Sequence, residues 1–178
     1  MTARHIYVDE TKPRSSYVVV ASVHGADDVQ ALRQVVRRLL LPGQRYLHMK
    51  DESEGRKREI AAEIVAAQVQ ANVYVAGKRY RTNNERRAKC LEALVEHHAS
   101  GPETLLIIDR DDTLVSFDNQ QLIEFTRRAG CRGTLRYEHR SDKTELLLGI
   151  PDAIAWCWGK GGSWRQLIRP AITGVYEL

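Results

Sequence analysis

With 178 residues, 43% of them hydrophobic and 28% charged, the chain is long enough to bury a core without disulfides and has an ordinary globular composition. No apolar run approaches the roughly 20 residues that span a bilayer, and the opening MTARHIYVDE lacks the apolar stretch of a signal peptide. Three widely separated cysteines argue against a disulfide framework and against a C-x-x-C zinc site. We therefore expect a cytoplasmic protein without membrane contact, folded as one domain over residues 1–178.

The charge balance is mildly basic, with a net charge of +4, and 20 of the 27 basic residues are arginines. The planar guanidinium group of arginine suits phosphate oxygens. A GC-rich coding sequence also favours arginine over lysine, so charge alone leaves nucleic-acid binding open.

The first third of the chain alternates strand-like and helix-like patterns. Two β-prone runs flank a turn at Pro13, which predicts a hairpin. Apolar residues then recur at helical spacing after a cap at Asp27 or Asp28. The predicted elements are strands at 5–10, 16–23 and 45–50, and a helix that ends before Pro42-Gly43.

The rest of the chain continues this alternation. Ser53 precedes one predicted helix, and Thr82, Asn83 and Asn84 are the candidate N-caps of the next. The run TLLIID lacks polar alternation, which is typical of a central strand. The predicted elements are helices at 55–70, 82–97 and 118–129, strands at 72–77, 104–109 and 134–139, helical segments at 146–159 and 164–168, and an extended tail.

A strand pair followed by alternating helices and strands predicts an α/β fold, with a mixed β-sheet flanked by α-helices. An antiparallel hairpin at the front and parallel strands later are typical of the ribonuclease H-like arrangement, although other three-layer folds fit the same pattern. The ribonuclease H-like sheet is the architecture that we expect.

Three acidic residues lie at the end or middle of apolar elements: Asp9, Asp109 and Asp152. Each has a structural alternative, as a strand end, a loop start or a carboxylate at the start of a helix after Pro151. Together they favour a shared site, because phosphoryl-transfer enzymes use such carboxylates to hold Mg²⁺ or Mn²⁺.

Long segments around these residues resemble a known family. IYVDE, PGQRYLHMKDES and LLLGIPDAIAWCWGKGGSW are similar to bacterial proteins classified as domain of unknown function 3800, especially actinobacterial members, and the similarity covers nearly the whole chain. The family's opening motif, tyrosine-x-aspartate-glutamate-serine, matches Tyr7, Asp9 and Glu10, with Thr11 where serine is usual. The resemblance implies a ribonuclease H-like fold.

The family's closing motif, alanine-aspartate on an apolar helix, matches Asp152, with Pro151 in place of alanine. The resemblance therefore implies that Asp152 faces Asp9 across a site. Many members carry glutamate-x-lysine where this chain has His48-Met49-Lys50, so the fourth ligand is left open between His48 and Glu52. A histidine on a strand is also often a plain half-buried residue.

These observations predict a nuclease that hydrolyses phosphodiester bonds with Mg²⁺ or Mn²⁺, on DNA or RNA. Asp9, Asp109 and Asp152 would hold the metal, and Glu10, His48 or Glu52 would assist. The basic residues expected to contact phosphates are Lys50, Arg79, Arg81 and Arg140. A non-catalytic module that binds nucleic acid or a protein partner through the same cleft is the alternative.

A third hypothesis comes from IIDRDDTLV, which resembles the start of haloacid dehalogenase-like phosphatases. Asp109 would then be the nucleophile and Asp111 the acid/base. Only 63 residues follow Val115, and no adjacent acidic pair follows Lys143, so the later parts of that site are missing.

The late apolar segment also carries three tryptophans, Trp156, Trp158 and Trp164. They could stack on bases. We expect them instead to pack in the core or in the interface of a homodimer, because large aromatic side chains dominate both.

Overall fold

The computed structural model describes residues 2–178, and within them six strands form one mixed sheet of order β5-β4-β1-β2-β3-β6. β2 is antiparallel to both of its neighbours, and every other pairing is parallel. The fold is therefore α/β with the ribonuclease H-like sheet that the sequence predicted. The strands are β1 (Arg4–Thr11), β2 (Tyr17–Gly25), β3 (Gln70–Ala76), β4 (Thr104–Asp109), β5 (Leu135–Arg140) and β6 (Ile172–Glu177).

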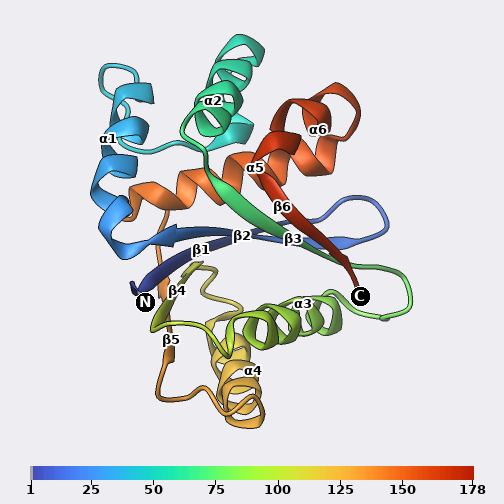
Figure 1. Cartoon of the computed structure of the whole chain (residues 1–178). Coiled ribbons are helices and arrows are strands. Elements are labelled where there is room, and N and C mark those ends of the chain that lie inside the picture. The colour runs from blue at the N-terminus through green and yellow to red at the C-terminus, as the bar shows by residue number, and fades with distance from the viewer. Residues whose placement is uncertain (1) are drawn as a thin grey trace.

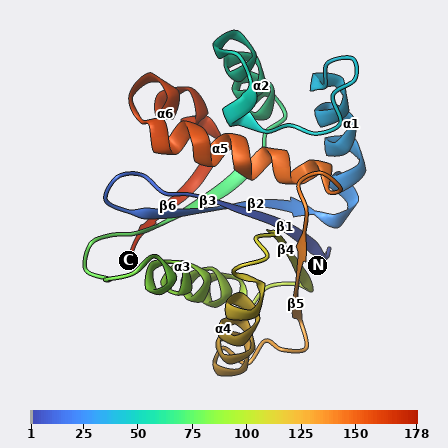
Figure 2. The ribbon, with the colours of Figure 1, turned by 180° about the vertical axis from the view of Figure 1, so that it is seen from behind.

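Helices cover both faces of this sheet (Figures 1 and 2). Four helices lie on one face: α1 (Val29–Leu39), α2 (Glu54–Ala66), α5 (Gly149–Lys160) and α6 (Gly162–Ile168). Two lie on the other: α3 (Asn83–His98) and α4 (Val115–Arg128). The result is a three-layer sandwich, and each face of the sheet has its own apolar core.

Strand alternation decides which side chains enter which core. In β1, Ile6 and Val8 pack toward α3 and α4, and Tyr7 packs toward α5. Successive side chains of a strand point to opposite faces. Asp9 therefore continues the Tyr7 face and Glu10 continues the Val8 face.

The predicted strand at 45–50 is wrong. The segment runs without a strand partner into a 3₁₀ turn, Met49–Asp51. Leu47 and Met49 are buried and His48 is not, an alternation that imitates a half-buried strand. The segment instead lies against α5, where the Met49 main-chain N–H donates a hydrogen bond to a side chain.

Two of the predicted helix caps are confirmed. The Ser53 side chain accepts a hydrogen bond from the Arg56 N–H, and Thr82 forms a reciprocal capping box with Glu85. At α1, Asp28 precedes the first helical residue, but its side chain makes no capping hydrogen bond. A short 3₁₀ turn, Ala26–Asp28, leads into that helix.

The helix predicted from residue 118 begins earlier, at Val115. Asp118 lies within its first turn and is completely buried, where it pairs with a buried arginine. Among the helices of residues 2–178, none combines the length and the apolar character needed to cross a membrane.

Candidate functional site

Asp9 and Asp109 end two neighbouring parallel strands. The register pairs Val8 of β1 with Ile108 of β4, so the next residue of each strand is one of the two aspartates. Both continue the face that carries Tyr7 and Ile107, which is the face covered by α5. Asp152 lies in the first turn of α5, so three elements bring one carboxylate each to this region.

The charges of these carboxylates act on one another. Burial, followed by the charges of Glu10, Asp152 and Asp109, raises the pKa of Asp9 well above its usual range. Burial, together with the charges of Asp142, Glu10 and Asp152, raises the pKa of Asp109 to about 6. Loss of solvation and mutual repulsion therefore both oppose ionisation here.

Neither Asp9 nor Asp109 has a basic side chain within ion-pair distance in residues 2–178. The Asp9 carboxylate accepts a hydrogen bond of 2.7 Å from the Glu10 main-chain N–H. The main chain of Asp142 lies beside the Asp109 carboxylate and lowers its pKa, against the larger effect of burial. Two partly buried carboxylates thus share one region without a compensating cation.

Asp152, in contrast, is held in place from the segment before α2. Its Oδ2 accepts a hydrogen bond of 2.7 Å from the Met49 N–H, and its Oδ1 lies 3.3 Å from His48 Nδ1. The hydrogen bond to Asp152 raises the pKa of His48 to about 9, although partial burial of the imidazole acts in the opposite direction. His48 is therefore protonated near neutral pH and forms an ion pair with the Asp152 carboxylate.

Glu10 turns to the opposite face of the sheet. Its carboxylate lies 3.1 Å from Arg87, whose guanidinium also makes two bonds of 2.7 Å to Asp118. His139 and Tyr17 complete this buried network. The structure therefore places Glu10 in a structural ion-pair network, although its charge still raises the pKa of Asp9.

The structure does not bring Glu52 toward the aspartates. Its carboxylate accepts hydrogen bonds from Gln44 and Arg56, between the end of α1 and the start of α2. It therefore ties the connecting segment to α2. Of the side chains proposed to assist the three aspartates, only that of His48 lies within ion-pair distance of one of them in residues 2–178.

The four predicted phosphate-contacting residues are dispersed. Lys50 is exposed in the turn beside His48. Arg79 and Arg81 are exposed in the loop after β3. Because β1 and β3 run in the same direction, this loop and Asp9 lie at the same end of the strands. Arg140 ends β5, where it forms ion pairs of 2.7 Å with both Glu138 and Glu145, so its charge is already compensated.

Asp111, the second aspartate of the phosphatase hypothesis, lies in a turn. Its carboxylate accepts hydrogen bonds from the main chain and the hydroxyl group of Thr113, and these bonds lower its pKa. Asp142, which the sequence did not single out, lies beside Asp109. No spacing signal marks it, because the loop after β5 brings it there.

The donor set suits a hard divalent cation, since all three aspartates offer carboxylate oxygens. The two aspartates without a basic partner are consistent with a missing positive charge. As they lie here, however, no group of three or more His, Cys, Asp or Glu side chains within residues 2–178 is placed to hold a metal ion.

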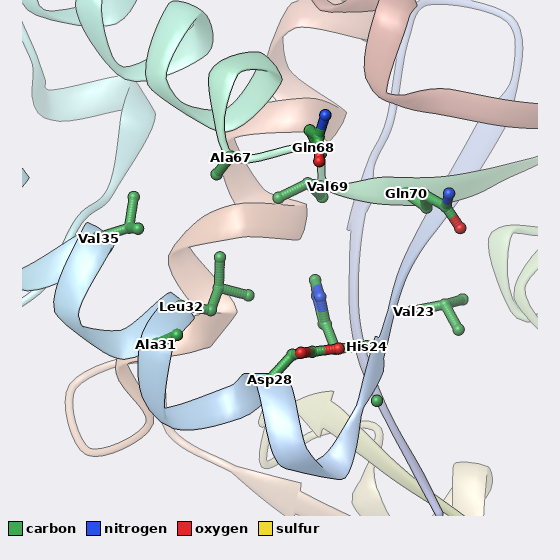
Figure 3. A pocket seen from close by; sticks show the side chains of 11 residues that line it. Val23, His24, Asp28, Ala31, Leu32, Val35, Ala67, Gln68, Val69 and Gln70 are labelled. Atoms are coloured by element: carbon green, nitrogen blue, oxygen red, sulfur yellow. The ribbon is translucent and has the colours of Figure 1, made fainter. Parts of the chain in front are cut away.

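A separate cavity of about 480 Å³ lies at the other end of β2 (Figure 3). Its wall includes His24, Asp28, Leu32 and Gln68, and the buried Nε2 atom of His24 has no hydrogen-bond partner among residues 2–178. None of the sequence-predicted site residues lines this cavity.

No protein-family model matches the chain, and no curated protein matches it. Membership in the domain of unknown function 3800 family therefore stays a prediction.

Proposed function

We propose that the protein is a nuclease that hydrolyses phosphodiester bonds with Mg²⁺ or Mn²⁺ held by Asp9, Asp109 and Asp152. The observation that carries this proposal is the convergence of these carboxylates from β1, β4 and α5 on one face of the sheet, two of them without a basic partner. Buried carboxylates are normally paired or bound to a metal.

Such a cation would supply an activated water molecule and stabilise the leaving oxygen. The chain's own contribution is to position the ligands. The Met49 N–H donates a hydrogen bond to one oxygen of Asp152, and His48 Nδ1 lies 3.3 Å from the other. Outer contacts of this kind orient metal-binding carboxylates and tune their basicity.

A second candidate is the non-catalytic binding module of the same fold. The absence within residues 2–178 of three side chains already placed around a metal favours it. The nuclease proposal requires that cation binding draw the aspartates closer together than they lie here. The two candidates therefore differ in whether metal binds and in whether nucleic acid is cut.

The test is cleavage of single-stranded and duplex DNA and RNA by the metal-free protein after addition of Mn²⁺ or Mg²⁺. We expect metal-dependent cleavage that disappears in Asp9→Asn and in Asp109→Asn. Asp112→Asn is the matched control, because this exposed aspartate pairs only with Arg110 in its own loop. Binding without cleavage would support the non-catalytic module, and cleavage that survives both substitutions would overturn the proposed site.

A further inference from the structure

Two tryptophans form a contact on the surface near α5 and α6. The rings of Trp156 and Trp164 meet edge to face, with centroids 4.9 Å apart and an interplanar angle of 88°. Both side chains are only partly buried, whereas Trp158 is buried in the core. The expectation of core packing therefore holds for Trp158, and Trp156 and Trp164 pack against the same core while part of each ring stays exposed.

Three cations cover this pair of rings. The Nζ atoms of Lys57 and Lys160 lie 4.5 and 5.4 Å from the Trp156 ring centroid, and the guanidinium of Arg58 lies 4.6 Å from that of Trp164. We call these five residues the basic–aromatic patch. They come from α2, α5 and α6, which lie side by side on one face of the sheet (Figure 1).

The positive charges of the patch are uncompensated. Within residues 2–178, Lys57, Arg58 and Lys160 make no ion pair with a carboxylate. Arg56, next to them in sequence, pairs with both Glu52 and Glu59. The contrast within one helix shows that α2 presents unpaired cations to the tryptophans and keeps its paired cation elsewhere.

The patch is continuous with the proposed site. In α5, the residues that are not buried are Asp152, Trp156, Gly159 and Lys160. Positions four apart lie on the same side of a helix, so one accessible stripe runs from Asp152 through Trp156 to Lys160 over about 12 Å. Lys57 belongs to the helix that follows the turn holding Asp152.

We propose that the basic–aromatic patch binds single-stranded nucleic acid, with phosphates on its three cations and a base on the Trp156–Trp164 pair. This inference rests on the proposed function, because the stripe on α5 would lead the strand to Asp152. Unpaired bases expose the flat faces that stack on aromatic rings. The flexible cationic side chains that lie over the rings attract the phosphates, and a cation that moves to a phosphate frees a ring face for a base. A duplex keeps those faces inside its base stack, so the patch favours a single strand.

The experiment measures binding without cleavage. Asp9→Asn protein in EDTA is titrated with a fluorescent oligodeoxythymidylate of about 16 nucleotides, and anisotropy and tryptophan emission are followed at several salt concentrations. We expect binding that quenches tryptophan emission, weakens with salt and is about tenfold tighter than binding to a duplex of equal length.

Two double variants, each of which removes two positive charges, test whether the oligonucleotide binds at the patch. Lys57→Gln with Lys160→Gln should lower affinity about tenfold and reduce the salt slope by about 1.4. Lys89→Gln with Arg127→Gln removes two exposed charges from α3 and α4, on the other face of the sheet, and should leave both values unchanged. Trp164→Phe should retain most of the affinity and Trp164→Leu should lose it.

The outcomes separate this inference from the proposed function. Three results would overturn the proposal that the patch binds single strands, even if the wild type cuts nucleic acid. These are an equal loss of affinity in both charge variants, equal affinity for single strand and duplex, or no binding in EDTA. Patch-dependent binding of a wild type that never cuts would support the patch and reject the nuclease.

Discussion

Met49 and Asp152, 103 residues apart in the sequence, are joined by a hydrogen bond of 2.7 Å from the Met49 N–H to the carboxylate. This bond attaches the segment before α2 to the start of α5. With the imidazole of His48 on the other oxygen, it satisfies a carboxylate that would otherwise lie at an apolar helix with no partner. Asp152 is thus positioned by the chain itself, whereas Asp9 and Asp109 are not paired with any cation in residues 2–178.

His48 should act as a positioning residue. We expect His48→Ala to lower the cleavage rate constant about 10- to 100-fold, because Asp152 loses the imidazole contact. His48→Gln can still donate to the carboxylate and should recover part of the rate. Steady-state kinetics with Mn²⁺ would separate the two effects, since the loss is expected in kcat or in metal affinity. A rate unchanged in His48→Ala would contradict this role.

Asp9→Asn should stabilise the metal-free protein while abolishing cleavage. At neutral pH, a partly buried carboxylate faces Asp109 and Asp152 without a cation, so its charge opposes folding. An amide keeps the shape and can still accept the Glu10 N–H. We expect the free energy of unfolding in EDTA to rise by about 1 kcal/mol. Urea denaturation measures it, and a loss of stability would show that the charge is compensated.

Arg87→Met should destabilise the protein strongly. The guanidinium holds two carboxylates, Asp118 and Glu10, in an almost fully buried network. Removing it leaves both charges without their partner, which typically costs about 3–5 kcal/mol. Arg127→Met, which breaks the exposed pair with Glu124 on α4, is the control and should leave the urea midpoint nearly unchanged. Equal effects of the two substitutions would contradict the structural role of the network.

Two buried histidines should make stability depend on pH. Burial lowers the pKa of both His24 and His98 to about 4, and His5 near His24 and Arg4 near His98 lower it further. Between their unfolded value of about 6.5 and about 4, the unfolded chain binds more protons than the folded one. Stability is therefore complete above about pH 6.5 and is lost as the pH falls toward 4, by on the order of 2–3 kcal/mol for each histidine.

Glutamine at these two positions would test this dependence, because it cannot titrate. His24→Gln and His98→Gln should each flatten the decline of the urea midpoint between about pH 6.5 and 4, and the double variant should flatten it most. His24 lines the cavity of Figure 3, so a molecule bound there would also shift its titration. An unchanged slope in the double variant would assign the acid sensitivity to the carboxylates.

Much of the fold could be predicted from local pattern. The apolar runs of β1, β2 and β4 and the caps at Ser53 and Thr82 depend on neighbours a few residues away, and the structure confirms them. The segment at 45–50 could not be predicted in this way. Its alternating burial comes from packing against α5, which lies a hundred residues further along the chain.

The candidate site, like the fold, was predicted from the sequence only in part. The sequence places Asp9 and Glu10 on opposite faces of a strand, because side chains alternate along β structure. Only the tertiary structure decides that α5 covers the Asp9 face, while Glu10 meets Arg87. Asp142 could not be anticipated, since a loop brings it to Asp109.

Apart from the strand wrongly expected at 45–50, the sequence by itself determined most of the secondary-structure order, the α/β class and the acidic ends of the strands, because these depend on residue type and period. The tertiary structure decided which carboxylates share a face, which have basic partners and which surface lies beside them. Those relationships join residues from β1, β4 and α5, and no local interaction specifies them.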